Sequence, residues 1–102
     1  MKIVALVTDL MDRSKVANAL AGVEFTTDPA AVTGADVVVV DLARHAATVA
    51  PARAAAPGAR IVAFGPHVDD ALLDQARRDG ADVVLARSRF FQDPAAAVVT
   101  GK

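Results

Sequence analysis

The sequence predicts a doubly wound α/β domain, in which helices cover both faces of a five-stranded parallel sheet. Five short apolar runs alternate with helix-prone segments along 102 residues, and such alternation is typical of parallel sheets with helices on both sides. The third run, DVVVVD at residues 36–41, holds four consecutive valines, which indicates a strand buried on both faces. A chain of this length builds one hydrophobic core, so we expect a single domain over residues 1–102.

The apolar runs are the predicted strands. They are short and mostly rich in β-branched residues, which suit a pleated and buried backbone. Each one is followed by a segment with helical spacing or a helix-start signal. The predicted strands cover residues 2–8, 23–27, 36–41, 60–65 and 82–87.

The segments between these runs are the predicted helices. Asp28 and Asp93 each precede a proline, the pattern of an N-cap followed by Pro at the first helical position. Asp69 is a third N-cap candidate, and Gly22 suits the left-handed residue that ends a helix. Pro51 interrupts an alanine-rich segment, so we expect the helix there to start or kink near it. The predicted helices cover residues 12–21, a short turn after 28, 43–56, 70–79 and 94–99.

Composition excludes several classes of function. Eleven basic and 12 acidic residues give a net charge of -1, so the strongly basic surface of a general nucleic-acid binder is absent. The absence of cysteine excludes disulfides, thiolate metal sites and a cysteine nucleophile. Apolar runs of four or five residues are too short to span a membrane. No signal-peptide pattern opens the chain, so we expect a cytoplasmic protein.

Residue usage and motifs narrow the expectation further. Alanine and valine supply 24 and 16 residues, and Arg outnumbers Lys by 8 to 3; this usage is associated with GC-rich bacterial genomes. The first strand is not followed by a dinucleotide-binding GxGxxG motif, and the chain has no phosphate-binding P-loop. It also lacks the GxSxG turn that presents a serine nucleophile. We therefore expect no catalytic residue.

The order of elements and the acidic residues at strand ends resemble the receiver domain of two-component response regulators. Asp9 follows the first strand, and Asp41 ends the third in VVVVDL. The resemblance covers nearly the whole chain and implies a flavodoxin-like sheet of order 2-1-3-4-5, with its site between strands 1 and 3. In that family an acidic pair after strand 1 holds Mg²⁺, and the Asp that ends strand 3 accepts a phosphoryl group. A Thr or Ser ends strand 4, and a Lys ends strand 5.

This chain departs from the family pattern at most of these positions. The acidic pair becomes Thr8-Asp9, the hydroxyl residue after strand 4 becomes Gly65, and the Lys becomes Arg87. Gly65 also suits a tight turn before Pro66. The sequence therefore resembles a degenerate receiver, or pseudo-receiver.

Asp9 and Asp41 are the candidate metal ligands, and Asp41 is the candidate phosphoacceptor. The carboxyl ends of strands 1 and 3 meet at one edge of the sheet, where two carboxylates can hold a weakly bound Mg²⁺; otherwise each one caps the loop after it. Arg87 fits two roles there: stabilising a phosphorylated Asp41, or pairing permanently with its carboxylate through a planar fork. We favour the permanent pair, which would block phosphorylation.

Two further groups of residues follow strands 4 and 5. His67, Arg87 and Arg89 are candidates for binding an anion or a phosphorylated partner, or else they are solvated loop charges. In the alternating geometry of a strand, one of Phe90 and Phe91 points inward and the other outward. The outward ring is a candidate partner surface; alternatively both rings pack beneath the last helices.

The leading functional hypothesis is a stand-alone regulatory or adaptor domain, not an enzyme, that acts by protein–protein contact with phosphorylation lost or atypical. The resemblance implies a contact surface over residues 69–99, from helix 4 through strand 5 to helix 5, suited to a protein partner or a homodimer. Nucleic-acid and membrane partners are not expected. One alternative is a working phosphoacceptor that uses Asp41. Another is a small-molecule or anion site at the carboxyl edge of the sheet, built from Asp9, Asp41, His67 and Arg87.

Overall fold

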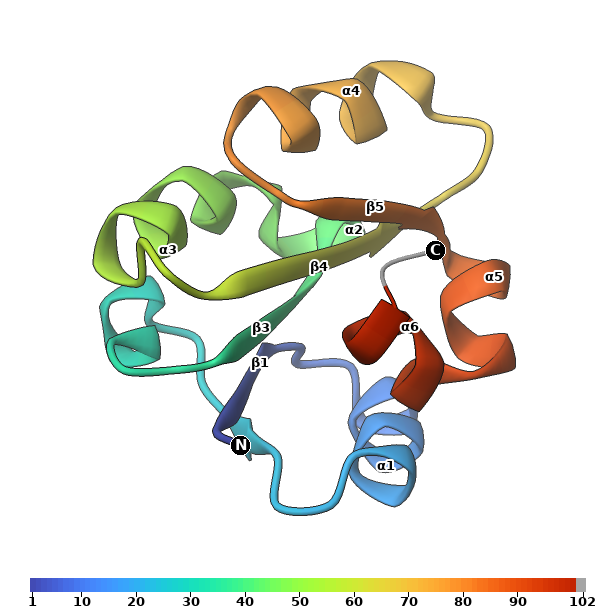
Figure 1. Cartoon of the computed structure of the whole chain (residues 1–102). Helices are drawn as coiled ribbons and strands as arrows, with labels where there is room; N and C mark the ends of the chain where they lie inside the picture. The colour runs from blue at the N-terminus through green and yellow to red at the C-terminus, as the bar shows by residue number, and fades with distance from the viewer. Residues whose placement is uncertain (101–102) are drawn as a thin grey trace.

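The five predicted strands form one parallel sheet in the order β2-β1-β3-β4-β5 (Figure 1). The computed structural model describes residues 1–100. The observed strands are shorter than or equal to the predicted ones: β1 (Ile3–Leu6), β2 (Glu24–Phe25), β3 (Val37–Asp41), β4 (Arg60–Gly65) and β5 (Val83–Ala86). The predicted sheet order and strand positions are therefore confirmed.

Helices cover both faces of the sheet (Figure 1). One face carries α1 (Leu10–Ala19), α5 (Arg87–Gln92) and α6 (Pro94–Thr100). The other carries the 3₁₀ turns η1 (Pro29–Val32) and η2 (Ala46–Thr48) together with α2 (Leu42–His45), α3 (Val49–Ala55) and α4 (Asp70–Arg78).

The alternation of side chains along β3 divides the core into two halves. Val37 and Val39 pack on the side of α1, α5 and α6, whereas Val38 and Val40 pack on the side of α3 and α4. All residues of this strand are buried. The run of valines is therefore the central, doubly covered strand that the sequence predicts.

Most helix boundaries follow the predicted signals. The carboxylates of Asp28, Asp69 and Asp93 accept hydrogen bonds from the backbone amides of the turns that they begin, so these caps are confirmed. Gly22 has φ of +78°, which is the left-handed conformation expected after a helix.

The helix expected to start near Pro51 does so: α3 begins at Val49, and Pro51 lies in its first turn, where a missing amide is tolerated. Two other local predictions were wrong. The first helix starts at Leu10 instead of residue 12, because Asp9 is its N-cap. Phe90 lies in helix α5 and not in an extended segment after β5, so the alternation of a strand does not apply to it.

Arg53 joins two loops at the amino-terminal edge of the sheet, the one between α3 and β4 and the one between α4 and β5. Its guanidinium donates to the carbonyl oxygens of Gly80 (3.0 Å) and Ala59 (2.8 Å) and pairs with Asp82 at 2.5 Å. Asp82 also accepts a hydrogen bond of 2.8 Å from the backbone amide of Ile61 at the start of β4. Gly80 has φ of +115°, and a Cβ there would lie 2.8 Å from Cγ of Arg53. A side chain at position 80 would therefore collide with Arg53, so this close contact requires glycine.

Candidate functional site

Asp9 and Asp41 lie at the carboxyl ends of β1 and β3, as the sequence predicts. Each carboxylate caps a helix. Asp9 accepts from the amide of Asp12 at 3.0 Å, and Asp41 accepts from the amide of Ala43 at 3.1 Å. Capping was one of the two predicted roles for these residues, and both carboxylates perform it.

Arg44 bridges these two carboxylates. Its Nη1 lies 3.4 Å from Oδ2 of Asp41, and its Nη2 lies 3.6 Å from Oδ1 of Asp9. The side chain of Asp41 is 1% exposed, and that of Arg44 is half exposed. The guanidinium therefore supplies a positive charge between the two predicted metal ligands. The sequence analysis missed Arg44, although its spacing of three residues from Asp41 places both on one helical face.

The predicted ion pair between Arg87 and Asp41 was wrong. Arg87 instead pairs with Asp12 on α1: its Nη1 donates to Oδ2 at 2.7 Å, and its Nη2 contacts the other carboxylate oxygen. The side chain of Asp12 is 1% exposed. Two boundary differences explain the change of partner. Helix α1 begins at Leu10, which makes Asp12 its third residue instead of its first, and Arg87 starts a helix instead of ending a strand.

The pair between Asp12 and Arg87 is held in its charged form. The hydrogen bond from Arg87 lowers the pKa of the Asp12 carboxyl, and burial of that carboxyl opposes this effect. The hydrogen bond to Asp12 likewise raises the pKa of the Arg87 guanidinium. A charged, doubly bonded pair therefore connects α1 to α5.

We expect Asp12 to contribute to acid unfolding. Because its pKa in the folded state lies below the ordinary value of 3.8, its contribution to stability is present above that pH and is lost as the pH falls through the folded-state pKa. Urea unfolding should therefore show a smaller loss of stability below pH 3.8 for Asp12→Asn than for the wild-type chain. Asp74→Asn, which alters an exposed ion pair on α4, is the matched control. If the free energy of unfolding fell equally with pH in the wild type and in Asp12→Asn, Asp12 would not contribute to acid unfolding.

Three phenylalanines pack together behind the Asp12–Arg87 pair. Phe90 is buried and stacks on Phe64 with 4.7 Å between ring centroids, while Phe91 is half-buried and meets both rings edge-on. The guanidinium of Arg87 lies 4.9 Å from the centroid of Phe91, and the ammonium of Lys15 lies 5.3 Å from the same centroid. Phe90 is therefore a core residue, and Phe91 alone keeps part of its ring at the surface.

His67 and Arg89 are exposed, and neither forms a hydrogen bond or an ion pair within the described part of the chain. The structure thus shows no contact that gathers them with Arg87, whose charge is directed to Asp12. Among residues 1–100, no group of three or more His, Cys, Asp or Glu side chains is placed to hold a metal ion.

Thr8 and Gly65 occupy two positions where the family pattern places functional groups. The hydroxyl of Thr8 lies 2.8 Å from Nε2 of His45. Gly65 ends β4 without a positive φ, and a Cβ at this position would lie 3.2 Å from both Cβ of Leu42 and Cδ2 of Leu73. Close packing therefore accounts for the glycine, because a larger side chain at this position would require Leu42 and Leu73 to move.

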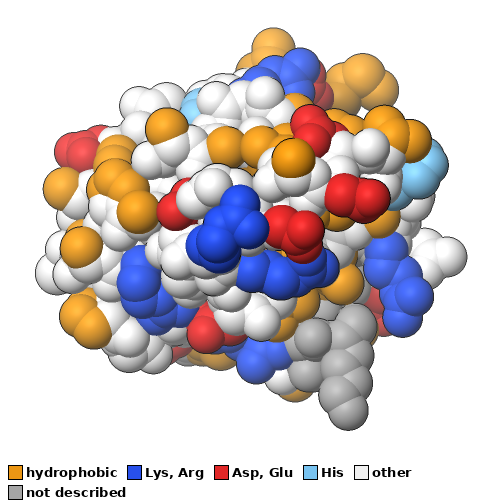
Figure 2. All heavy atoms as spheres, turned by 90° about the horizontal axis from the view of Figure 1, so that it is seen from above, with side chains coloured by type: hydrophobic (Ala, Val, Ile, Leu, Met, Phe, Trp, Pro, Cys, Tyr) orange, Lys and Arg blue, Asp and Glu red, His pale blue; other side chains and the backbone are white. Residues whose placement is uncertain are grey.

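Figure 2 views the molecule from above, over α4 and β5, which belong to the predicted contact surface. Basic and acidic side chains lie next to one another across this face, with hydrophobic side chains scattered between them. Arg77 and Asp74 form one such pair at 2.7 Å. No helix among residues 1–100 combines the length and the hydropathy that a membrane span requires.

Neither a protein-family model nor a curated protein matches this sequence. Solved structures do match its fold. A response regulator from Burkholderia pseudomallei, solved with a phosphorylated aspartic acid, a calcium ion and citrate, aligns with a TM-score of 0.78 and 23% identity over 98% of this chain and 68% of that one. A CheY-like protein (TadZ) from Pseudomonas aeruginosa aligns with a TM-score of 0.69 and 24% identity over 86% and 87% of the two chains.

A third similar structure is a putative CpaE2 pilus assembly protein from Sinorhizobium meliloti. It aligns with a TM-score of 0.67 and 21% identity over 96% of this chain and 97% of its own. All three align with most of this chain at TM-scores of 0.67 or higher and at 24% sequence identity or lower. The fold of this chain is therefore that of the CheY-like receiver domains.

Proposed function

We propose that this chain is a receiver-type regulatory or adaptor domain that acts by contact with a protein partner, without phosphoryl transfer to Asp41. The observation that carries the proposal is the guanidinium of Arg44, which lies within 3.6 Å of both candidate metal ligands. A tethered positive charge at this place supplies the neutralisation that a divalent cation would otherwise provide. A cation that approached the carboxylates would also be repelled by Arg44.

Three other features support the loss of phosphoryl transfer. Thr8 replaces an acidic residue, so the edge has fewer of the charged oxygen ligands that Mg²⁺ prefers. Arg87 binds Asp12, so its charge is not free to stabilise a phosphorylated Asp41. Gly65 brings no hydroxyl, and its neighbours Leu42 and Leu73 are packed too closely to admit one without moving.

The similar structures are compatible with either mode of action. The Burkholderia regulator carries a phosphorylated aspartic acid and a calcium ion, whereas the Sinorhizobium protein is named for pilus assembly. The fold alone therefore does not indicate whether Asp41 is phosphorylated, and that question depends on the residues at the carboxyl edge of the sheet. Arg44 and the Asp12–Arg87 pair favour a domain that works by binding.

For the contact surface we propose α4, β5 and the helices that follow them, within residues 69–99. Phe91 exposes part of its ring there, and Val99 is 68% exposed. The interspersed charges over α4 suit a partner of complementary charge. The same surface could serve a protein partner or a second copy of the chain.

Incubation with acetyl phosphate and Mg²⁺ is the direct test. We expect intact-mass spectrometry to find no added phosphoryl group, about 80 Da, on the wild-type chain or on Asp41→Asn. Arg44→Gln removes the tethered charge and should allow Mg²⁺ to raise the melting temperature, whereas the wild type and Arg78→Gln, an exposed variant on α4, should not respond. A stable adduct on wild-type Asp41 that disappears in Asp41→Asn would overturn the proposal in favour of a working phosphoacceptor.

A further inference from the structure

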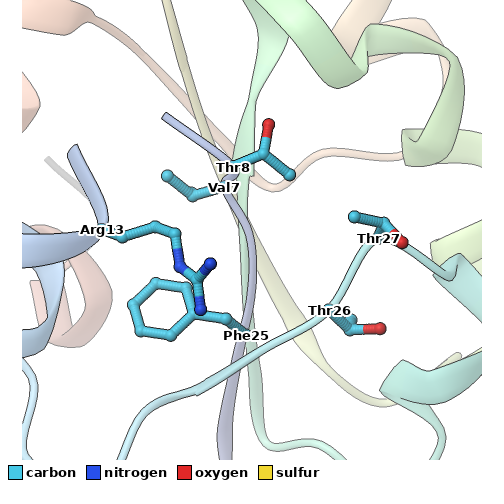
Figure 3. Close-up of a pocket in the computed structure, with 6 residues that line it drawn as sticks. All are labelled: Val7, Thr8, Arg13, Phe25, Thr26 and Thr27. Atoms are coloured by element: carbon cyan, nitrogen blue, oxygen red, sulfur yellow. The ribbon is translucent and has the colours of Figure 1, made fainter. Parts of the chain in front are cut away.

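A cavity lies between the carboxyl ends of β1 and β2, lined by residues of both strands, of the loops that follow them and of α1. Its volume is about 330 Å³, at the lower end of the range for small-molecule sites. Figure 3 shows Arg13 projecting from α1 on one side of the cavity and the loop after β2 on the other. The lining residues are Val7, Thr8, Arg13, Phe25, Thr26 and Thr27.

Arg13 gives this cavity a positive charge that no acidic group neutralises. Its guanidinium lies 4.7 Å from the centroid of Phe25, and it forms no ion pair with any of the described residues. No acidic residue is among those that line the cavity. Stacking on the ring restrains the guanidinium, so less side-chain entropy is lost when an anion binds its outer edge.

Thr26 and Thr27 lie across the cavity from Arg13 (Figure 3), and their hydroxyls supplement this charge. Oγ1 of Thr26 accepts a hydrogen bond from the amide of Asp28 at 3.1 Å, so its proton remains available for donation to a ligand. Thr27 forms no hydrogen bond through its hydroxyl among the described residues. Val7 is buried and supplies an apolar wall. One guanidinium and two hydroxyls match the several oxygens of a phosphate group better than the two oxygens of a carboxylate.

Two acidic residues that adjoin the lining in the sequence are already engaged. Asp9 follows Thr8 directly, but its carboxylate caps α1 and pairs with Arg44. Asp28 follows Thr27, and its carboxylate caps η1 through the amide of Ala30. Because the carboxylates of Asp9 and Asp28 bind these other groups, neither one pairs with the guanidinium of Arg13.

We propose that this cavity binds the phosphate group of a small phosphate monoester. Arg13 holds the phosphate, the hydroxyls of Thr26 and Thr27 donate to its oxygens, and the organic part of the ligand lies against Val7. With one charged partner in an open cavity, we expect a dissociation constant of about 1 mM. This site uses none of the residues Asp9, Asp41 or Arg44, so it stands independently of the adaptor proposal.

Amide NMR of the intact chain tests the proposal, with adenosine monophosphate as the probe and adenosine and inorganic phosphate as separate arms. We expect saturable shifts at the amides of Thr8, Thr26 and Thr27 with adenosine monophosphate. Adenosine should leave these amides unchanged, and inorganic phosphate should bind more weakly. Arg13→Gln and Thr27→Val should weaken binding, the former about tenfold, while Arg78→Gln should bind as the wild type does.

Three outcomes would overturn the proposal. The first is equal shifts in the wild type and Arg13→Gln. The second is a response to adenosine alone, which would make the base and not the phosphate the bound group. The third is tighter binding of inorganic phosphate than of adenosine monophosphate, which would make the cavity a free-anion site and exclude an ester as its ligand.

Discussion

Replacing Arg87 with Met is expected to lower the free energy of unfolding by about 3 kcal/mol, because it leaves the buried carboxylate of Asp12 without its partner. Met keeps an unbranched apolar side chain at this position, whereas the charge, its hydrogen bonds and the guanidinium contact with Phe91 are lost. For a domain of this size, that loss corresponds to a fall in melting temperature of roughly 10–20 °C. Thermal and urea unfolding, followed by circular dichroism, provide the measurement.

Two further variants separate charge burial from general damage to α5. Arg89→Met changes an exposed arginine on the same helix that forms no ion pair in the described structure, and its effect should stay within about 0.5 kcal/mol. Adding Asp12→Asn to Arg87→Met removes the unpaired charge and should recover part of the lost stability. If the loss of stability in the double variant equals the sum of the losses in the two single variants, the Asp12–Arg87 pair is not the cause of the instability.

Arg53→Met is expected to have the second-largest effect, a loss of about 2–3 kcal/mol. The substitution removes the donors that satisfy carbonyl oxygens of Pro57, Ala59 and Gly80, together with the ion pair to Asp82. The guanidinium connects the loop after α3 with the loop after α4, where β4 and β5 start. Urea unfolding gives the loss, and hydrogen exchange should show the amide of Ile61 less protected than in the wild type.

Arg77→Met is the matched control for Arg53, because it removes an exposed ion pair on α4 and should cost less than about 1 kcal/mol. Arg53→Lys keeps the charge but not the planar fork, so its stability should lie between those of Arg53→Met and the wild type. A Lys variant as stable as the wild type would show that charge, and not the fork of donors, is what the loops require.

The sheet could be predicted from the sequence because its signals are local. The valine run marks the central strand, and each of Asp28, Asp69 and Asp93 caps the turn that follows it directly. The family pattern supplied the sheet order, and Asp9 and Asp41 meet at the predicted edge. These features depend on neighbouring residues or on the topology, both of which are visible before any side chain is placed.

The partners of the arginines could not be predicted in the same way. Arg87 and Asp12 are 75 residues apart, and their pairing depends on where α1 and α5 begin, to within two residues. A start at residue 12 would have made Asp12 the first residue of α1 instead of the third, and an extended Arg87 would have directed its side chain elsewhere. Arg44 is different: its spacing from Asp41 was a usable signal, but it lies outside the family motif and was overlooked.

The brevity of β2 affects how this domain can associate through its backbone. Outer strands of a sheet leave unpaired amides and carbonyls that can template pairing with another chain. With two residues, β2 offers too little extended backbone for a ladder, whereas β5 at the opposite side has four. Strand-to-strand addition to this sheet, whether by a partner or in aggregation, is therefore directed to β5.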